Sequence, residues 1–162
     1  MRAGKRDNTL RYITFKEGPD IMKVLSMKQP WASLFVLREA IYETRTWRTT
    51  YRGPLAIHTS KQVDKAVCSH KAIQALLGKH GNTVDNLPTG KIIAVCNLIN
   101  CLKVTNNQST WAVLENGVIV SENNYFLGDF NEGNYAWEVQ DMKLLDHPIP
   151  AKGHLGLWEY GM

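Results

Sequence analysis

Short apolar runs and alternating apolar and polar residues recur along this chain, and both patterns are typical of β-strands. The alternation is clearest over residues 41–47, where successive side chains must point to opposite faces of a strand. The strands predicted in chain order are residues 23–27, 41–47, 55–60, 91–104, 135–144 and 155–160. With two helices near the start and long connections, they predict an α+β fold, a small open barrel or curled sheet of about six strands.

Two segments have helical periodicity. Pro30 suits the first turn of a helix, and apolar residues follow it at helical spacing for about two turns. Residues 62–79 carry a longer apolar stripe, which Thr59 or Ser60 can cap. In that arrangement Ser60 and Lys61 lie where a helix begins, so free N–H groups and an ammonium form a possible anion site.

The polarity of the chain changes near residue 22. Residues 1–21 are polar and lack periodicity, and we expect a disordered extension there. A second hypothesis is that translation starts at Met22, because residues 16–18 back-translate to a purine-rich stretch that resembles a ribosome-binding site. A flexible arm carrying five bases is the alternative. Residues 22–162 are expected to form one domain, since roughly 100–200 residues per domain is usual.

The charge is distributed unevenly. Residues 22–65 carry eight Lys and Arg against three acids, a net of +5, whereas residues 66–162 carry six against nine, a net of −3. The basic third of the chain also contains two tryptophans. This asymmetry favours an anionic partner, and nucleic acid first.

Several classes of protein are disfavoured by the sequence. No apolar stretch approaches the ~18–20 residues of a membrane span, and residues 1–21 have no secretory core, so we expect a cytoplasmic protein without membrane contact. Cys96 and Cys101 lie in one predicted strand, on opposite faces and roughly 16 Å apart, so free thiols are expected. The histidines show no ligand-type pairing. We expect no metal, no cofactor and a monomer.

The first candidate group for chemistry is Glu43, Arg45 and Trp47. A carboxylate accepts hydrogen bonds from a base amino group, a guanidinium grips phosphate, and an indole stacks on a base. The alternative is a surface salt bridge beside a core tryptophan. The two interpretations are balanced because four further cations lie close in sequence: Lys28, Arg48, Arg52 and Lys61.

A second candidate group precedes the first helix. Lys28 and Gln29 supply a cation and an amide next to Trp31, where free helix N–H groups favour anions. The alternative is an ordinary helix start with a buried Trp31. His58 is a possible acid or base near neutral pH, although a lone histidine in a strand is more often merely exposed.

Together these residues resemble a known family. The relevant blocks are Ser26–Ser33 (Ser-Met-Lys-Gln-Pro-Trp-Ala-Ser), Glu43–Trp47 (Glu-Thr-Arg-Thr-Trp), Tyr51–Ile57, Pro88–Gly90, Tyr135–Glu138 and Gly156–Trp158. In this order they resemble the activating-signal-cointegrator homology (ASCH) domain, one of the PUA-like barrels, over about residues 22–160. The resemblance implies a PUA-like small β-barrel with two main helices. Its cleft is expected to bind RNA, nucleotides or a modified base.

The chain departs from the family hallmark Gly-x-Lys-x-x-Glu-x-Arg. Glu43 and Arg45 match it, but Arg38 stands at the glycine position and Ala40 at the lysine position. Small members of the family hydrolyse 4-acetylcytidine or cleave RNA with chemistry that depends on that lysine, and the hydrolases carry Thr at the position of Glu43. Ala40 can neither activate a nucleophile nor stabilise an oxyanion. Either a lysine from another strand replaces it, or the domain binds without catalysing.

Three functions follow, in order of preference. The first is a module that binds RNA, other single-stranded nucleic acid or a modified nucleoside, with a Glu43 pKa that the cations lower if the pocket is wet. The second is a hydrolase in which Glu43 is the acid or base and Lys61 or Lys28 the cationic partner; a raised Glu43 pKa favours it. The third is an interaction domain without a working pocket. The predicted binding residues are Lys28, Gln29, Trp31, Glu43, Arg45, Trp47, Arg48, Arg52, Ser60 and Lys61.

Overall fold

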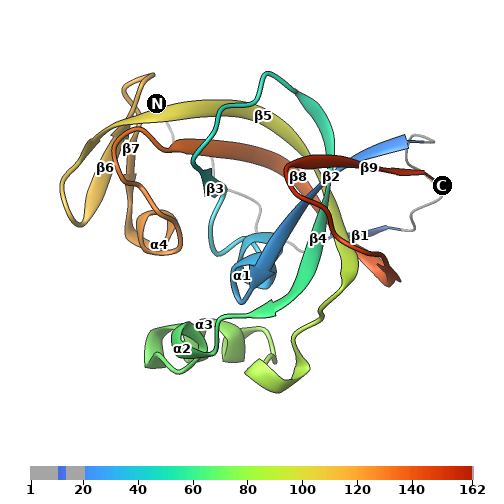
Figure 1. Cartoon of the computed structure of the whole chain (residues 1–162). Coiled ribbons are helices and arrows are strands. Elements are labelled where there is room, and N and C mark those ends of the chain that lie inside the picture. Colours follow the sequence, from blue (N-terminus) through green and yellow to red (C-terminus); the bar gives the residue numbers. More distant parts are fainter. Residues whose placement is uncertain (1–10, 14–20, 162) are drawn as a thin grey trace.

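Strands dominate the protein, for which the coordinates are a computed structural model that describes residues 11–13 and 21–161 (Figure 1). The strands are β1 (Arg11–Ile13), β2 (Ile21–Gln29), β3 (Tyr42–Arg45), β4 (Gly53–Val63), β5 (Lys91–Asn107), β6 (Trp111–Leu114), β7 (Ile119–Ser121), β8 (Tyr135–Pro150) and β9 (Leu157–Gly161). The helices are α1 (Trp31–Val36), α2 (Lys65–Cys68), α3 (Lys71–Lys79) and α4 (Glu122–Phe126), with a 3₁₀ helix at Val84–Asn86. The α+β class is therefore confirmed.

One sheet connects all the described strands. Its main path runs β1-β8-β5-β4-β2-β9, while β3 joins β8, and the β6–β7 hairpin extends from β5. β5 and β8 pair along most of their length, and Figure 1 shows them crossing the molecule side by side, with α4 and the hairpin at one end. Among the described residues the path ends at β1 and β9 without closure, so the predicted small barrel is not confirmed. The nine described strands and four short α-helices also exceed the six and two that were predicted.

The predicted helix over residues 62–79 is wrong in its boundaries. β4 continues to Val63, and the helical part is divided into α2 and α3. Asp64, rather than Thr59 or Ser60, caps α2, because its Oδ1 accepts a hydrogen bond from the Val67 N–H at 3.1 Å. Likewise β3 ends at Arg45, two residues before the predicted end of that strand.

The prediction for residues 1–21 is wrong for its middle part. Arg11–Ile13 form β1, which pairs in parallel with Lys143–Leu145 of β8. Ile21, also within that prediction, is the first residue of β2, and residues 1–10 and 14–20 lie outside the described residues. In the part of the chain that the structure describes, no helix is both long enough and apolar enough to cross a membrane.

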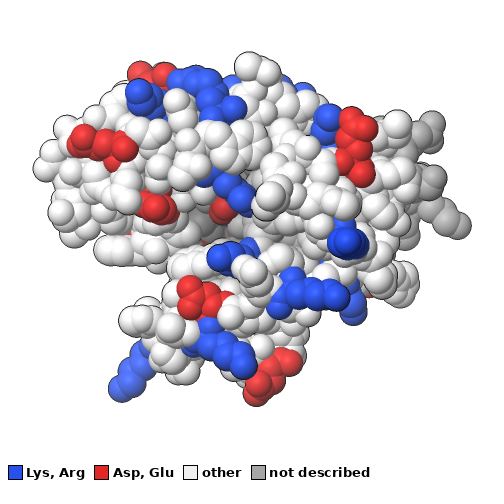
Figure 2. All heavy atoms as spheres, viewed as in Figure 1, with Lys and Arg blue, Asp and Glu red and all other residues white. Residues whose placement is uncertain are grey.

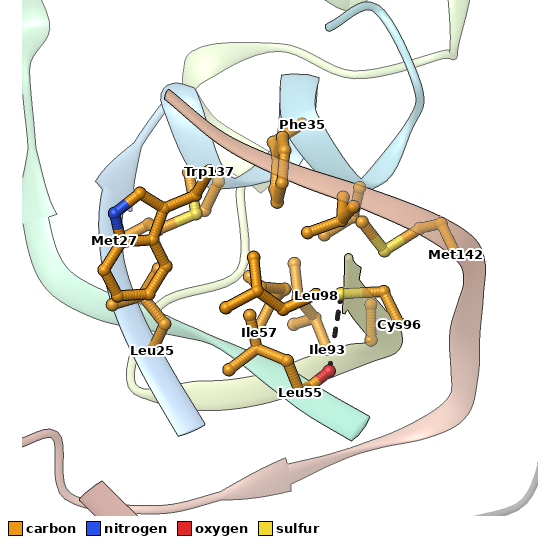
Figure 3. Packing of buried hydrophobic residues seen from close by; sticks show 14 of the residues in the cluster. Leu25, Met27, Phe35, Leu55, Ile57, Ile93, Cys96, Leu98, Trp137 and Met142 are labelled. Carbon is orange, nitrogen blue, oxygen red and sulfur yellow. Dashed lines mark hydrogen bonds between the residues drawn. The ribbon is translucent and has the colours of Figure 1, made fainter. Parts of the chain in front are cut away.

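The main core lies between α1 and the strands β2, β4, β5 and β8, where Trp137 is fully buried (Figure 3). The Cys96 thiol donates a hydrogen bond to the Leu55 carbonyl oxygen at 3.4 Å. Cys101 packs into the same cluster as Cys96, because the pairing register shifts by one residue between Leu98 and Asn100. The expectation that the two thiols face opposite sides is therefore wrong, while all three described cysteines are free.

Candidate functional site

A cleft of about 1460 Å³ opens between strands from the first half of the chain and two segments from the second half. One side consists of the ends of β2, β3 and β4 together with Trp31. The other side consists of Leu127–Asp129 and of the β8–β9 connection, residues 151–156. Figure 2 shows a hollow near the middle of the molecule with Lys and Arg side chains beside it.

Two contacts tie the distant segments to the strands. The Asp129 N–H donates to Thr44 Oγ1 of β3 at 2.7 Å. Ala151 donates its N–H to the Gly90 carbonyl oxygen at 3.1 Å and accepts from His58 Nε2 at 2.7 Å. The second wall of the cleft is thus fixed by hydrogen bonds between residues far apart in the sequence.

Six of the ten predicted binding residues line this cleft: Lys28, Trp31, Glu43, Arg45, Ser60 and Lys61. Glu43 and Arg45 share a strand face as predicted, with Arg45 Nε 3.2 Å from Glu43 Oε1. Arg45 Nη2 also donates to the Ser26 carbonyl oxygen at 2.7 Å. The guanidinium is therefore held in place before any ligand arrives.

Glu43 is in a different electrostatic state from the one predicted. Burial raises the pKa of its carboxyl to about 7, because desolvation of the charged form outweighs the attraction of Arg45. The side chain retains 18% exposure, on the cleft side. The lowered pKa expected for a wet pocket is therefore not found, and Glu43 exchanges its proton near neutral pH.

Gln29 does not reach the cleft. It is fully buried, and its Oε1 accepts from the Ser33 N–H at 3.0 Å while its Nε2 donates to Ser33 Oγ and to the Pro88 carbonyl oxygen, both at 2.8 Å. The amide of Gln29 thus satisfies a free N–H group in the first turn of α1. Gln29 therefore does not contribute to the predicted anion site at this helix start, because its amide is already paired.

Trp47, Arg48 and Arg52 also lie outside the cleft lining. Trp47 packs edge-on against Trp137, with the ring centroids 4.7 Å apart. Arg48 forms an ion pair with Glu115 at 3.0 Å, and Arg52 donates to backbone carbonyls of its own turn. The alternation of side chains stops where β3 ends, so Trp47 does not continue the face of Glu43 and Arg45.

Ser60 and Lys61 line the cleft for a different reason than predicted. Both belong to β4 instead of a helix start, so the predicted helix-terminal anion site around them is wrong. Lys61 is exposed and lies over Gly90, where an added Cβ would be 3.8 Å from Lys61 Cε. Lys61 therefore contributes an exposed positive charge to the rim.

The structure shows how Arg38 and Ala40 are accommodated at the two hallmark positions where this chain departs from the family. Arg38 has a φ of 67°, a left-handed conformation that glycine adopts without strain. Ala40 is buried with Leu34, Leu77 and other apolar side chains, and it does not line the cleft. Position 40 therefore supplies no cation to the cleft.

Sequence reasoning missed several residues of the cleft. Lys152 and His154 come from the β8–β9 connection, and Asp129 from the connection before β8. His58, expected to be exposed, is only 1% exposed and faces the cleft from β4. The proline-rich residues 147–150 predict a link between the last two strands, but β8 continues to Pro150 and the connection begins at Ala151; no local pattern indicated which strands that connection would cover.

Comparison with known domain families matches residues 25–144 to the ASCH domain. Because the match spans well over half of the chain, this protein belongs to the ASCH domain family. It is also 37% identical over 91 residues to Activating signal cointegrator 1 of Homo sapiens, and equally to that of Mus musculus. The matched part covers 54% of this chain and 16% of each relative, so the chain corresponds to a small portion of those proteins.

Proposed function

We propose that the cleft binds RNA or another single-stranded nucleic acid, including a modified nucleoside within it. The observation that supports this most is the excess of cations around one cavity, because neutralised phosphates release counterions and so drive binding. Membership of the ASCH family agrees with a nucleic-acid ligand. Among the described residues, the lining has four cations against two carboxyls: Lys28, Arg45, Lys61 and Lys152 against Glu43 and Asp129.

The shape of the cleft and its aromatic residue support a strand over a free small molecule. A volume of about 1460 Å³ exceeds the roughly 300–1,000 Å³ of ordinary small-molecule pockets. Trp31 is half-buried at the cleft, where its ring can stack on a base. Arg45 and Glu43 lie together, so a phosphate or base edge can meet a guanidinium and a carboxyl at the same place.

The test is a titration of fluorescein-labelled single-stranded RNA, followed by anisotropy at increasing salt. Replacing the three lining lysines by Ala should weaken binding at least tenfold and flatten the slope of log K against log salt by about 2, since each contact contributes about 0.7. The matched control replaces three exposed lysines outside the cleft: Lys65, Lys71 and Lys103. Equal losses in both variants would show that binding is spread over the surface, and the proposal would fail.

A substitution at Trp31 separates the contribution of stacking to RNA affinity from that of charge. Trp31→Leu keeps an apolar side chain against the core but removes the indole, so affinity should fall about fivefold or more. The salt slope should not change, because no phosphate contact is lost. A change in slope without a change in affinity would contradict a stacking role.

One observation favours a second function, hydrolysis in the same cleft. A carboxyl whose pKa is about 7 can both accept and donate a proton at neutral pH, as a general acid or base must. The cationic partner would be Lys61 or Lys28. Turnover of 4-acetylcytidine or cleavage of RNA by the unaltered protein, lost in Glu43→Gln, would establish it; absence of both reactions leaves binding as the function.

A further inference from the structure

A row of three hydrogen-bonded side chains crosses neighbouring strands at one end of the cleft. Ser26 of β2 lies opposite His58 of the parallel strand β4, and Trp158 belongs to the adjacent strand β9. Ser26 Oγ is 2.9 Å from His58 Nδ1 and 3.0 Å from Trp158 Nε1. His58 Nε2 is 2.7 Å from the Ala151 carbonyl oxygen. None of the predicted binding residues named above belongs to this row.

The partners of the row fix where its protons lie. The Trp158 indole can only donate, so Ser26 Oγ accepts from it. The Ala151 carbonyl can only accept, so His58 Nε2 carries a hydrogen. In the neutral imidazole Nδ1 is then an acceptor, and the Ser26 hydroxyl hydrogen points to it. The row is therefore a serine hydroxyl aimed at a base whose other nitrogen is held by a third group.

The surroundings keep this base neutral and the serine within reach. Burial lowers the pKa of His58, and His154 nearby acts in the same direction, while the hydrogen bond to Ala151 opposes them. Both Ser26 and His58 line the cleft, and Ser26 is half-buried rather than enclosed. Arg45, which grips the Ser26 carbonyl oxygen, supplies a positive charge next to the serine.

We propose that Ser26 and His58 form a nucleophile–base pair that hydrolyses a carboxylic ester carried on an anionic, phosphate-bearing molecule. The geometry meets the requirements for such a pair: a nucleophile–base hydrogen bond, a group that orients the base, and a cleft on which both open. The cations of the cleft favour a substrate that carries negative charge. This inference uses the binding cleft of the proposed function but goes beyond binding.

The reaction consumes only the ester and water, and no cofactor takes part. Ser26 Oγ attacks the carbonyl carbon as its proton passes to His58 Nδ1, and the carbonyl π pair moves to oxygen. When the tetrahedral adduct collapses, the bond to the leaving oxygen breaks and that oxygen takes the proton from Nδ1. Water then attacks the acyl-Ser26 ester, giving one proton to Nδ1, and collapse returns it to Ser26 and releases the carboxylic acid.

Gly153 lies directly over the pair. A Cβ added there would be 2.8 Å from His58 Cε1 and 3.0 Å from Ser26 Oγ, so only glycine leaves the row undisturbed. Gly153→Ala should therefore lower the reactivity of Ser26 while leaving both side chains in the protein. Gly161→Ala is the matched control, because an added Cβ there meets nothing within 4 Å.

The first experiment needs no variant. The full chain is incubated with phenylmethanesulfonyl fluoride, or briefly with p-nitrophenyl acetate, and the adduct is located by peptide mass spectrometry. We expect one sulfonyl or acetyl group on Ser26. A protein that stays unmodified at Ser26 while other residues react would overturn the proposal.

Variants then test the base. Ser26→Ala and His58→Gln should each lower p-nitrophenyl acetate turnover about 100-fold or more, whereas Ser69→Ala, an exposed serine outside the cleft, should not. Near-ultraviolet circular dichroism checks the fold, and the adduct on the unaltered protein decides the matter where a variant does not fold. If folded His58→Gln turned over p-nitrophenyl acetate at the rate of the unaltered protein, the Ser26–His58 pair would have only a structural role.

RNA binding is measured on the same proteins. Ser69→Ala, which changes a residue outside the cleft, should match the unaltered protein in RNA affinity. Labelling of Ser26 without RNA binding would refute the proposed function alone, and RNA binding without labelling would refute the nucleophile alone.

Discussion

Glu43→Gln tests the electrostatics of the cleft through stability. The folded pKa of Glu43 is about 7, above its ordinary value of 4.5, so between these values the folded protein holds a proton that the unfolded chain has released. Stability therefore falls as pH rises through this window, and the cost is complete above pH 7. The difference corresponds to at most about 3 kcal/mol, and less where cleft water solvates the carboxylate.

Glutamine keeps the shape of the side chain and cannot ionise, so the variant should lack this pH dependence. Urea unfolding at pH 4.5, 6 and 8 should give similar free energies for both proteins at the lowest pH. At pH 8 the variant should be more stable by about 1–3 kcal/mol. The exposed Glu132→Gln variant gives the reference for removing a carboxyl from this protein. A difference between the unaltered protein and Glu43→Gln that is constant across pH, or grows toward acid, would refute the reasoning.

Three further substitutions test the packing by urea unfolding. Gln29→Ala should cost about 2–3 kcal/mol, because Ser33 and the Pro88 carbonyl lose buried partners; no loss would mean that water replaces the amide. Gly78→Ala should stabilise α3 by about 0.5–1 kcal/mol, since its new Cβ meets nothing; destabilisation would contradict that. Gly128→Ala should cost about 1–3 kcal/mol, because its Cβ would be 2.7 Å from a ring carbon of Phe130; a neutral result would show that the ring moves freely.

The part of the site that could be predicted rests on local geometry. Side chains two residues apart in a strand share a face, so the Glu43–Arg45 pair followed from the sequence. The concentration of cations in the first third is a property of composition, and Lys28 and Lys61 both reached the cleft. The family was also identified from short blocks of sequence.

The errors arose where a distant partner decided the outcome. The fate of Gln29 depended on the Pro88 carbonyl, 59 residues away. His58 is buried and its ring forms two hydrogen bonds, because the β8–β9 connection, with Ala151 and Gly153, passes over it. Periodicity describes which face a residue occupies and carries no information about what covers that face.

The sequence by itself determined the family, the α+β class, most of the strands and the basic character of one cleft wall. Only the tertiary structure decided the second wall, the break between α2 and α3, and the protonation of Glu43. The physical reason is that periodicity and net charge are summed along the chain, whereas desolvation and hydrogen-bond pairing depend on which segments meet. The attraction of Arg45 lowers the pKa of Glu43, but the sheet and its connections exclude the solvent, and this desolvation raises the pKa by more.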